Sequence, residues 1–594
     1  MKQPKIIVVG GGLAGLMATI RVAEAGVPVD LFSIVPVKRS HSVCAQGGIN
    51  AAKNQKGEGD TTAKHFDDTI YGGDFLANQP LVKRMCEAAP GIIDLLDRMG
   101  VMFNRTPEGL LDYRRFGGTL YHRTAFAGAT TGQQLLYALD EQVRRHESEG
   151  KVKKFEGSTF LSAVIDEAGV CRGICAMDLR SMEVKTYPAD AVIFATGGIG
   201  AIFGRSTNSV VCTGSAQSAL FQQGVDYANG EFIQVHPTAI PGEDKLRLMS
   251  ESARGEGGRV WVPRNPSDKR PPRTIPDAER FYFLEEWYPK YGNLVPRDIA
   301  TRAIHRIVYQ EKLGIDGQAA VYLDVTHIPR EILNHKLEGI LEIYEKFIGV
   351  DPREEPMKVF PAMHYTMGGI WVNGEDQATS IPGIYAAGEC EYQYHGANRL
   401  GANSLVSCIF GGGLAGTAAV KYAKSLDKGA DGVASSVFES EKKRQDAQNQ
   451  ALISNDGAEN PITIWRELGD IMTEHVTVTR INKNLEAAYA MLQGLQERYK
   501  KINLSDRTQW SNQTLNFARE LGNMLVLARV ITVGAFHRNE SRGAHYKPDF
   551  PDRDDANWLK TTRAKWVNND IELTYEPVDI SQITPRPRRY DAAK

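Results

Sequence analysis

The fold of this chain is decided by residues 5–33, which read KIIVVGGGLAGLMATIRVAEAGVPVDLFS. The apolar run 5–9 predicts a short buried strand, and the glycines after it predict a tight turn. Residues 16–25 predict a helix, because their apolar side chains recur on one face, and Gly26 ends that helix. A second apolar run over 27–32 predicts another strand. The segment therefore predicts a βαβ unit, in which a crossover helix joins two parallel strands.

Three glycines in the predicted turn have the spacing of a dinucleotide-binding fingerprint. Gly10, Gly12 and Gly15 form Gly-x-Gly-x-x-Gly directly after the strand and at the start of the helix. The first glycine makes the turn, the second lets the backbone approach a pyrophosphate, and the third lets helix and strand pack closely. The helix N-terminus adds amide donors and a partial positive charge. The pattern departs from the usual one at Ser33, which stands where an acid would hold the adenosine ribose.

Composition and charge exclude several classes of protein. The chain has 594 residues, 42% hydrophobic and 24% charged, so we expect roughly three to four globular domains. The formal net charge of −2 gives no basic field, which argues against nucleic acid as a partner. No run approaches about 18 uninterrupted apolar residues, so we expect no transmembrane helix. The seven cysteines are scattered, which is typical of a reducing compartment and predicts no metal site.

Glycine is the residue type in excess, with 57 residues gathered mainly in clusters. Clustered glycine indicates backbone held close to a large ligand, or turns at positive φ. Two clusters follow predicted buried strands, in VIFATGGIG at 192–200 and IYAAGE at 384–389. We interpret both as strand ends that meet a flavin dinucleotide in the same sheet, and the alternative is ordinary tight turns.

The later part of the chain has a different pattern. Residues 262–276 (VPRNPSDKRPPRTIP) predict an exposed loop, and helical patterns follow at 298–312 and 330–348. From about residue 431 we expect packed amphipathic helices, and the tail after Gly543 predicts extended chain on the surface. The apolar positions that share a face of one such helix are Leu485, Ala488, Met491, Leu492 and Leu495.

The segment RSHSVCAQGG at 39–48 resembles the histidyl-flavin site in the flavoprotein subunits of succinate dehydrogenase and fumarate reductase, the complex II family. In that family the histidine of the motif is joined covalently to FAD, which implies the same bond for His41. The resemblance covers essentially the whole chain and is greatest to the bacterial menaquinone-linked type. Further matching motifs are RTPEGLLDYRRFGG at 105–118, TGGIG at 196–200, EFIQVHPT at 231–238, RGEGG at 254–258, PRDIATRA at 296–303, HYTMGGI at 364–370, AAGE at 386–389, HGANRLGANSL at 395–405 and ESRGAHYKPDFPDRDDANW at 540–558.

The resemblance also implies a substrate site and a proton relay. The residues that match the family's clamp for a C4 dicarboxylate are His236, Ser250, His364 and Arg399. An arginine with imidazole donors suits two carboxylates. Arg297 matches the arginine that moves the proton, and Glu251 and Arg254 match its relay to solvent. A relay arginine needs a dry site with other cations and a carboxylate, because guanidinium otherwise stays protonated.

The cofactor contacts implied by the resemblance are spread along the chain. They are Gly10, Gly11, Gly12, Leu13, Ala14, Gly15, Ser33, Lys38, Ser40, His41, Ala45, Gln46, Gly47, Gly48, Ser215, Glu389, Arg399, Ser404 and Leu405. Two further departures occur. Ser215 stands where several members have Asp, which puts that contact in doubt. Ala253, beside the relay, stands where many members have Cys, and its presence predicts an activity that resists thiol reagents.

The implied fold is α/β, with a doubly wound FAD-binding domain split in the sequence, an inserted α+β capping domain and a C-terminal helical domain. The predicted limits are 1–240 and 361–430 for the FAD-binding domain, 241–360 for the capping domain, 431–546 for the helical domain and 547–594 for an extended C-terminal segment.

The implied activity is the interconversion of succinate and fumarate by hydride transfer with covalently bound FAD. Electrons would pass to an iron–sulfur subunit, because this chain has no cysteine set for a cluster, and a cytochrome b-type membrane anchor would be a separate subunit. The chain would then be peripheral, on the cytoplasmic face of the cell membrane. The alternatives are a quinol:fumarate reductase working mainly in reverse, a soluble L-aspartate oxidase and a non-catalytic flavin-binding electron carrier. The L-aspartate oxidase family lacks a covalent histidine at the position of His41 and the tail HYKPDFPDRDDANW.

Overall fold

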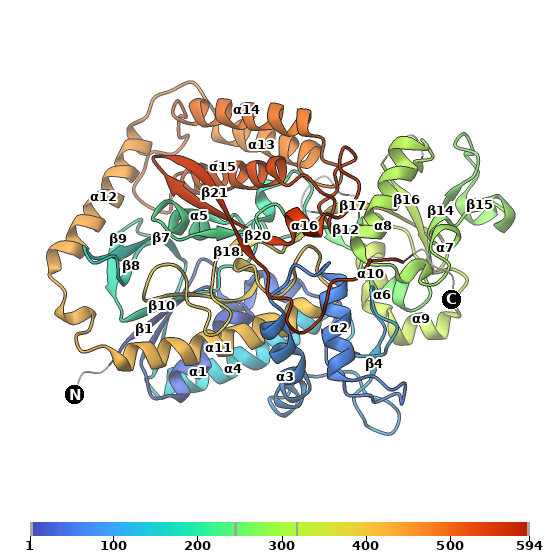
Figure 1. Cartoon of the computed structure of the whole chain (residues 1–594), viewed down its shortest axis with the longest axis horizontal. Helices are drawn as coiled ribbons and strands as arrows, with labels where there is room; N and C mark the ends of the chain where they lie inside the picture. Colours follow the sequence, from blue (N-terminus) through green and yellow to red (C-terminus); the bar gives the residue numbers. More distant parts are fainter. Residues whose placement is uncertain (1–3, 241, 243–245, 316–318, 591–594) are drawn as a thin grey trace.

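A parallel five-stranded sheet, whose strands β1 and β10 are labelled at the left of Figure 1, is built from distant parts of the chain. The computed structural model describes residues 4–240, 242, 246–315 and 319–590. The strand order is β19 (Ile384–Ala386), β10 (Ala191–Phe194), β1 (Ile6–Val9), β2 (Val29–Ser33) and β6 (Val152–Glu156). Every pairing is parallel, so the carboxyl ends of the strands meet at one edge. The predicted α/β fold, with a sheet completed by a late segment of the chain, is confirmed.

Alternate side chains of β1 enter the cores on the two faces of this sheet. Ile6 and Val8 pack with α1 (Leu13–Glu24) and α11 (Asn403–Ser425). Ile7 and Val9 pack with a second sheet, whose strands are β7 (Ser158–Ile165), β8 (Cys171–Asp178) and β9 (Val184–Pro188). A strand buried on both faces needs a continuous apolar run, as residues 6–9 provide. Helix α1 starts earlier than predicted, because the glycine turn passes directly into it.

The inserted segment contributes a six-stranded antiparallel sheet, seen with its helices at the right of Figure 1. Its order is β13 (Arg247–Leu248), β12 (Ile233–Ile240), β17 (Met357–Thr366), β16 (Val321–Asp324), β14 (Arg259–Pro263) and β15 (Arg280–Phe281). Its helices include α8 (Arg297–His305), α9 (Arg330–Lys336) and α10 (Glu338–Ile348). Strand β12 lies before the predicted boundary at residue 240 but pairs with β17, so the two domains share this sheet. The loop predicted over 262–276 is largely exposed beyond Pro263.

The predicted helices before the C-terminal region differ from the observed ones in detail. Helix α8 ends at His305, and a π-helical turn over Arg306–Gln310 continues it.

The helical domain contains α12 (Ser435–Ser454), α13 (Pro461–His475), α14 (Asn482–Tyr499) and α15 (Gln513–His537). Four of the five apolar positions predicted for α14 are buried, whereas Met491 is 46% exposed. Met491 lies at the margin of the apolar stripe, where its flexible side chain reaches solvent.

The segment predicted as extended chain over residues 547–594 contains regular elements within its described part. It contains the short helix α16 (Asp555–Trp558) and a hairpin of β20 (Lys560–Val567) and β21 (Asp570–Pro577). Asn568 and Asn569 join the two strands, both at positive φ, as a tight hairpin turn requires. Strand β20 also pairs with β11 (Tyr227–Ala228), so the tail extends a sheet of the FAD-binding domain.

Helix α11 is the one helix in the described part of the chain that is long and apolar enough to span a membrane by length and composition. Its most apolar window is 61% buried inside the protein. Gly412 and Gly416 of α11 face the backbone of α1, where a Cβ atom on Gly412 would lie 2.2 Å from the Ala14 carbonyl oxygen. The helix therefore packs tightly in the core of the FAD-binding domain.

Candidate active site

One cavity of about 510 Å³ lies at the carboxyl edge of the parallel sheet. Its lining includes Gly10, Ser33, Ala195 and Glu389, which end or closely follow four strands of that sheet. This is the edge at which doubly wound folds bind ligands. The same cavity continues to residues of the predicted substrate site. Those residues are Ser250, Glu251, Arg297, His364 and Arg399.

The glycine turn brings backbone close to the cavity. Gly10 has a φ of +118°, and a Cβ atom on it would lie 2.1 Å from the Ala195 carbonyl oxygen. A Cβ atom on Gly15 would lie 1.8 Å from the Gly10 carbonyl oxygen, so Gly15 serves helix–strand packing and does not line the cavity. The amide of Leu13 at the start of α1 donates to the Ser42 hydroxyl over 3.3 Å. The turn thus has the close packing that the fingerprint predicts.

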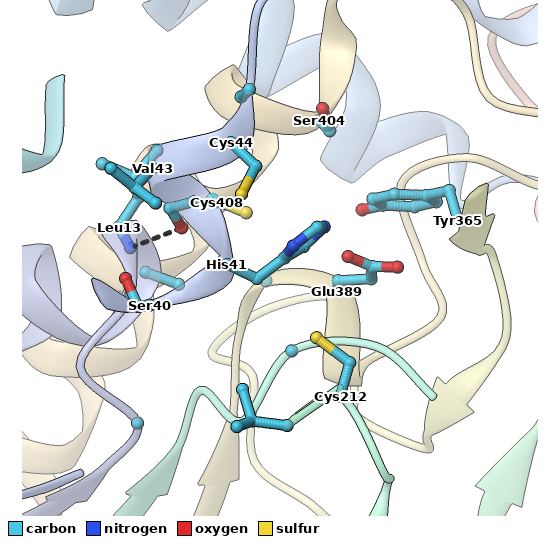
Figure 2. A pocket seen from close by; sticks show the side chains of 18 of the residues that line it. Leu13, Ser40, His41, Val43, Cys44, Cys212, Tyr365, Glu389, Ser404 and Cys408 are labelled. Atoms are coloured by element: carbon cyan, nitrogen blue, oxygen red, sulfur yellow. Dashed lines mark hydrogen bonds between the residues drawn. The ribbon is translucent and has the colours of Figure 1, made fainter. Parts of the chain in front are cut away.

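His41 lies in a short 3₁₀ turn over His41–Cys44, and its ring extends into the cavity toward Tyr365 and Glu389 (Figure 2). Its Nδ1 accepts a hydrogen bond from the Ser209 amide at 3.2 Å, and the Asn208 side-chain amide lies 3.4 Å from its Nε2. The same Asn208 amide donates to the carbonyl oxygen of His364 at 2.8 Å. The loop that holds His41 is thereby tied to the predicted substrate site. No motif in the sequence points to Asn208 or Ser209.

The cavity fits a flavin nucleotide, because it offers polar atoms without partners beside close-packed backbone. Within the described chain, Ser40 Oγ, Gln46 Oε1 and Arg399 Nε are buried, line the cavity and have no hydrogen-bond partner. Buried polar atoms normally have partners, so these atoms indicate a polar ligand. Burial raises the pKa of Glu389 to about 7, which leaves that carboxyl able to donate a hydrogen bond.

Most of the predicted cofactor residues line this cavity. Those that do so are Gly10, Gly11, Gly12, Leu13, Ala14, Ser33, Ser40, His41, Ala45, Gln46, Gly47, Gly48, Ser215, Glu389, Arg399, Ser404 and Leu405. Ser215 accepts a hydrogen bond from the Asn523 side chain at 2.7 Å. Lys38 lies outside the lining, and its Nζ is 3.6 Å from Asp140 and 3.8 Å from Glu141. Its charge is therefore used in ion pairs beside the site.

Arg297, Glu251 and Arg254 form one buried chain of ion pairs. The Nε and Nη2 atoms of Arg297 lie 2.9 Å from Glu251 Oε2, and Arg254 Nη2 lies 2.9 Å from Glu251 Oε1. All three side chains are at most 5% exposed. Burial acts to raise the pKa of Glu251, but the two arginine charges outweigh it and hold that pKa below its ordinary value. The residues predicted as a relay are thus in direct contact, and Arg254 itself lies behind the cavity wall.

Two glycines confine the central carboxylate of this chain. A Cβ atom on Gly117 would lie 1.8 Å from Glu251 Oε1, and one on Gly401 would lie 3.0 Å from Oε2. At the far end Arg254 Nη1 donates to the Asn293 carbonyl oxygen at 2.7 Å, and Asn293 is half-buried. The chain of groups therefore leads from the cavity toward the surface.

The predicted carboxylate clamp is brought together from four segments of the chain. Ser250, His364 and Arg399 line the cavity, whereas His236 lies behind His364 with the ring centres 5.0 Å apart. Burial and nearby arginine charges lower the pKa of both histidines well below the ordinary value, so both are neutral at pH 7. Thr207 Oγ1 lies 2.7 Å from His364 Nδ1 and fixes that ring. Burial lowers the pKa of Arg399 to about 9.

Gln234 is a residue of this site that the sequence analysis missed. Its side chain is fully buried, and its Oε1 accepts a hydrogen bond from Arg297 Nη1 at 3.0 Å. Its Nε2 donates to Asn398 Oδ1 at 2.9 Å and to the Arg399 carbonyl oxygen at 2.8 Å. The two donor contacts fix which way the amide faces. Gln234 lies in the motif EFIQVHPT, two residues before His236 on β12, and that placement was the available signal.

The prediction about thiols requires a correction. Ala253, beside the relay residue Arg254, is fully buried in an apolar cluster and carries no thiol. However, Cys44, Cys212 and Cys408 all line the cavity near His41 (Figure 2). Burial raises the pKa of Cys408 to about 12, which makes that thiol unreactive. Resistance to thiol reagents is therefore expected only of the relay, and not of the cavity as a whole.

The fold and cavity define an FAD-binding protein of the doubly wound class. A family model described as "FAD binding domain" matches residues 5–405, and one described as "Fumarate reductase flavoprotein C-term" matches residues 465–590. The succinate dehydrogenase flavoprotein subunit of Bacillus subtilis is 62% identical over 100% of both chains. The fumarate reductase flavoprotein subunit of Haemophilus influenzae is 35% identical over 99% of this chain and 96% of the relative.

A solved structure of an Escherichia coli quinol fumarate reductase variant matches this chain with a TM-score of 0.91 and 32% identity, covering 100% of each chain. The family model for FAD binding covers more than half of the sequence. This chain belongs to the family of flavoprotein subunits of succinate dehydrogenase and fumarate reductase.

Proposed function

We propose that this chain is the flavoprotein subunit of a succinate:quinone oxidoreductase, which interconverts succinate and fumarate. The observation that carries the proposal is the buried Arg297–Glu251–Arg254 chain, which opens into the cavity that also contains His364 and Arg399. The identity of 62% to a succinate dehydrogenase subunit supports oxidation as the main direction. The 35% identical fumarate reductase subunit makes net fumarate reduction the second candidate.

Arg399, His364 and Ser250 hold the two carboxylates of the dicarboxylate, and His236 packs behind His364. A guanidinium binds one carboxylate through two parallel N–H bonds, and a neutral imidazole adds one donor. The contact of Arg399 Nη1 with Ser404 Oγ at 3.3 Å helps to fix its direction, while its Nε remains available. The substrate is thereby held with its central carbon–carbon bond in a defined position.

Arg297 first gives a proton to Glu251, and the neutral guanidine then accepts a proton from one methylene carbon of succinate while a hydride leaves the neighbouring carbon. FAD, when bound, supplies the acceptor for that hydride and passes the electrons on singly. Glu251 passes its proton to Arg254 as Arg254 releases one toward solvent, and the proton taken from succinate returns Arg297 to its charged state. In fumarate reduction the same residues deliver the proton. Cation neighbours in a dry site are what make a guanidinium able to exchange protons.

We also propose that His41 holds the FAD covalently. The motif around His41 and the position of its ring in the cavity support this bond. Mass spectrometry of a proteolytic peptide spanning residues 40–48 is expected to show a flavin adduct. An unmodified peptide from FAD-replete, assembled enzyme would exclude the bond.

An iron–sulfur subunit and a cytochrome b-type membrane anchor are the proposed partners, with this chain peripheral on the cytoplasmic face of the cell membrane. The family consists of proteins named as flavoprotein subunits, which supports assembly with other chains. The described residues contain no group of three or more His, Cys, Asp or Glu side chains suited to a metal ion.

A turnover assay tests the proposed function. The purified complex is expected to oxidise succinate with an artificial dye, and the same chain without partners is expected to keep dye reduction but to lose quinone reduction. L-Aspartate serves as the competing substrate. Turnover of L-aspartate without turnover of succinate would assign the chain to the oxidase alternative, and no turnover with either would support a carrier role.

A further inference from the structure

The last described residues form a strap along the FAD-binding domain. We name residues 583–590 the C-terminal strap. Ile583 exchanges two backbone–side-chain hydrogen bonds with Gln79 at the start of α3 (Gln79–Arg98), at 2.8 and 2.9 Å. Arg586 lies 2.6 Å from Asp67 of α2 (Thr62–Gly72). In Figure 1 this red segment passes α2 and ends beside the green capping elements.

The tip of the strap is buried between the two domains. Tyr590 is only 4% exposed, and its ring centre lies 5.5 Å from that of Tyr71 on α2 and 5.1 Å from that of Tyr291, which precedes α8. The Arg589 amide donates to the Tyr71 hydroxyl at 2.6 Å, and that hydroxyl donates to the Arg589 carbonyl oxygen at 3.0 Å. Aromatic pairs at these distances stabilise the contact. The tip thus joins the FAD-binding domain to the segment that leads into α8.

Arg588 forms a two-pronged ion pair with Asp298 in the first turn of α8. Its Nη1 and Nη2 lie 2.5 and 3.1 Å from the two carboxylate oxygens, and the two side chains are 6% and 1% exposed. Burial acts to raise the pKa of Asp298, but Arg588, together with the weaker partner Arg302 on α8 at 3.4 Å, outweighs burial and holds that pKa below its ordinary value. A bidentate pair fixes both distance and direction. The helix turn that carries Asp298 also carries Arg297, as the preceding residue.

We propose that Arg588 is a positioning residue for Arg297. The strap holds the first turn of α8 against the FAD-binding domain, so that the Arg297 guanidinium keeps its contacts with Glu251 and Gln234 at the cavity. The position of α8 affects the site because the cavity is lined by groups from both domains. The strap contacts α8 at Asp298. A displacement of about 1 Å in a positioned group costs on the order of 100-fold in rate. The inference rests on the proposed role of Arg297 in proton transfer.

Steady-state kinetics of the assembled holoenzyme, expressed per bound flavin, test this role in both directions with artificial dyes. Arg588→Gln is expected to lower kcat by roughly 10- to 100-fold, with KM within about threefold. The solvent deuterium isotope effect on kcat of fumarate reduction is expected to rise, because in that direction the proton that Arg297 delivers comes from solvent and its transfer becomes slower than the other steps. Arg588→Lys keeps the positive charge but cannot make the two parallel contacts with Asp298, and its kcat is expected to lie between those of Arg588→Gln and the unmodified enzyme. The matched control is Arg586→Gln, which breaks an ion pair of the same strap without touching α8.

An unchanged kcat and isotope effect in Arg588→Gln would overturn the proposal, as would an equal loss in Arg586→Gln. If Arg588→Gln does not yield folded protein, Arg588→Lys decides, because it must still show the raised isotope effect. Arg297→Gln is measured alongside. An active Arg297→Gln enzyme refutes the proposed proton role itself, whereas an inactive one beside a normal Arg588→Gln enzyme refutes only the role of the strap.

Discussion

Replacing Arg297 with glutamine is the most direct test of the proposed proton transfer. Arg297 makes two contacts with Glu251 Oε2 at 2.9 Å and one with Gln234 Oε1 at 3.0 Å. Glutamine is too short to keep all three contacts. Glu251 would still be paired with Arg254 at 2.9 Å, whereas the Gln234 oxygen would be buried without a donor. The expected loss of folding stability is about 1–3 kcal/mol, the cost of one unsatisfied buried group.

The expected loss of rate is larger than the loss of stability. A positioned general acid or base contributes a factor of about 10²–10⁴. At about 1.4 kcal/mol for each factor of ten, this is about 3–6 kcal/mol of transition-state stabilisation. We expect kcat of Arg297→Gln to fall by that factor, while KM changes little because the clamp is formed by other residues.

The assay is dye-coupled succinate oxidation and fumarate reduction, with covalent flavin measured in every preparation. Arg399→Gln is the matched control. It removes a guanidinium from the clamp and is expected to raise KM and also to slow turnover through misorientation. A nearly normal kcat in Arg297→Gln, with only KM raised, would refute the reasoning. Glu251 acting through a water molecule would then become the better candidate for the proton.

Three further predictions follow from the cavity. His41→Ser is expected to keep FAD non-covalently through the glycine turn, and a lowered flavin potential should impair succinate oxidation far more than fumarate reduction; redox titration and both assays check this. Gln234→Glu should place a second carboxylate beside Arg297 and direct one of its oxygens at the buried acceptors Asn398 Oδ1 and the Arg399 carbonyl oxygen, which should lower kcat at least about tenfold in the same assays. An unchanged rate would show that the amide is dispensable. Burial raises the folded-state pKa of Glu389 from about 4.5 to about 7. The carboxyl is therefore more stable protonated, and its contribution, complete at acid pH, is lost as the pH rises through about 7. Flavin-free protein should thus lose less unfolding free energy between pH 5 and 8 after Glu389→Gln, as measured by urea titration.

Local sequence was sufficient for the parts of the structure that depend on near neighbours. Residues 5–33 predicted the βαβ unit because apolar runs, a glycine turn and a helix lie within one short segment. The hairpin turn at Asn568 and Asn569 had a local signal too, since asparagine tolerates positive φ, whereas the pairing of β20 with β11 depends on tertiary structure. Met491 had the right periodicity but lies at the margin of the apolar stripe, where 46% of its surface is exposed.

The resemblance of motifs predicted which residues form the site but not the contacts that make it work. Arg297, Glu251 and Arg399 come from separate segments, and only the folded chain places the first two 2.9 Å apart. Lys38 was predicted to contact the cofactor from its position in the motif, but in the folded chain it lies outside the cavity lining and pairs with Asp140 and Glu141.

The contacts of Gln234 and Arg588 are the clearest products of tertiary structure. Gln234 bonds to Arg297 and to the Arg399 backbone, and Arg588 pairs with Asp298, which lies 290 positions earlier in the chain. No local pattern encodes such pairs, because hydrophobic burial of the domains brings the segments together and the polar side chains then find partners in the space left to them. The sequence by itself determined the sheet, the cofactor turn and the family of this protein. The folded structure alone decided which charges meet in the dry interior, where a buried charge needs a partner.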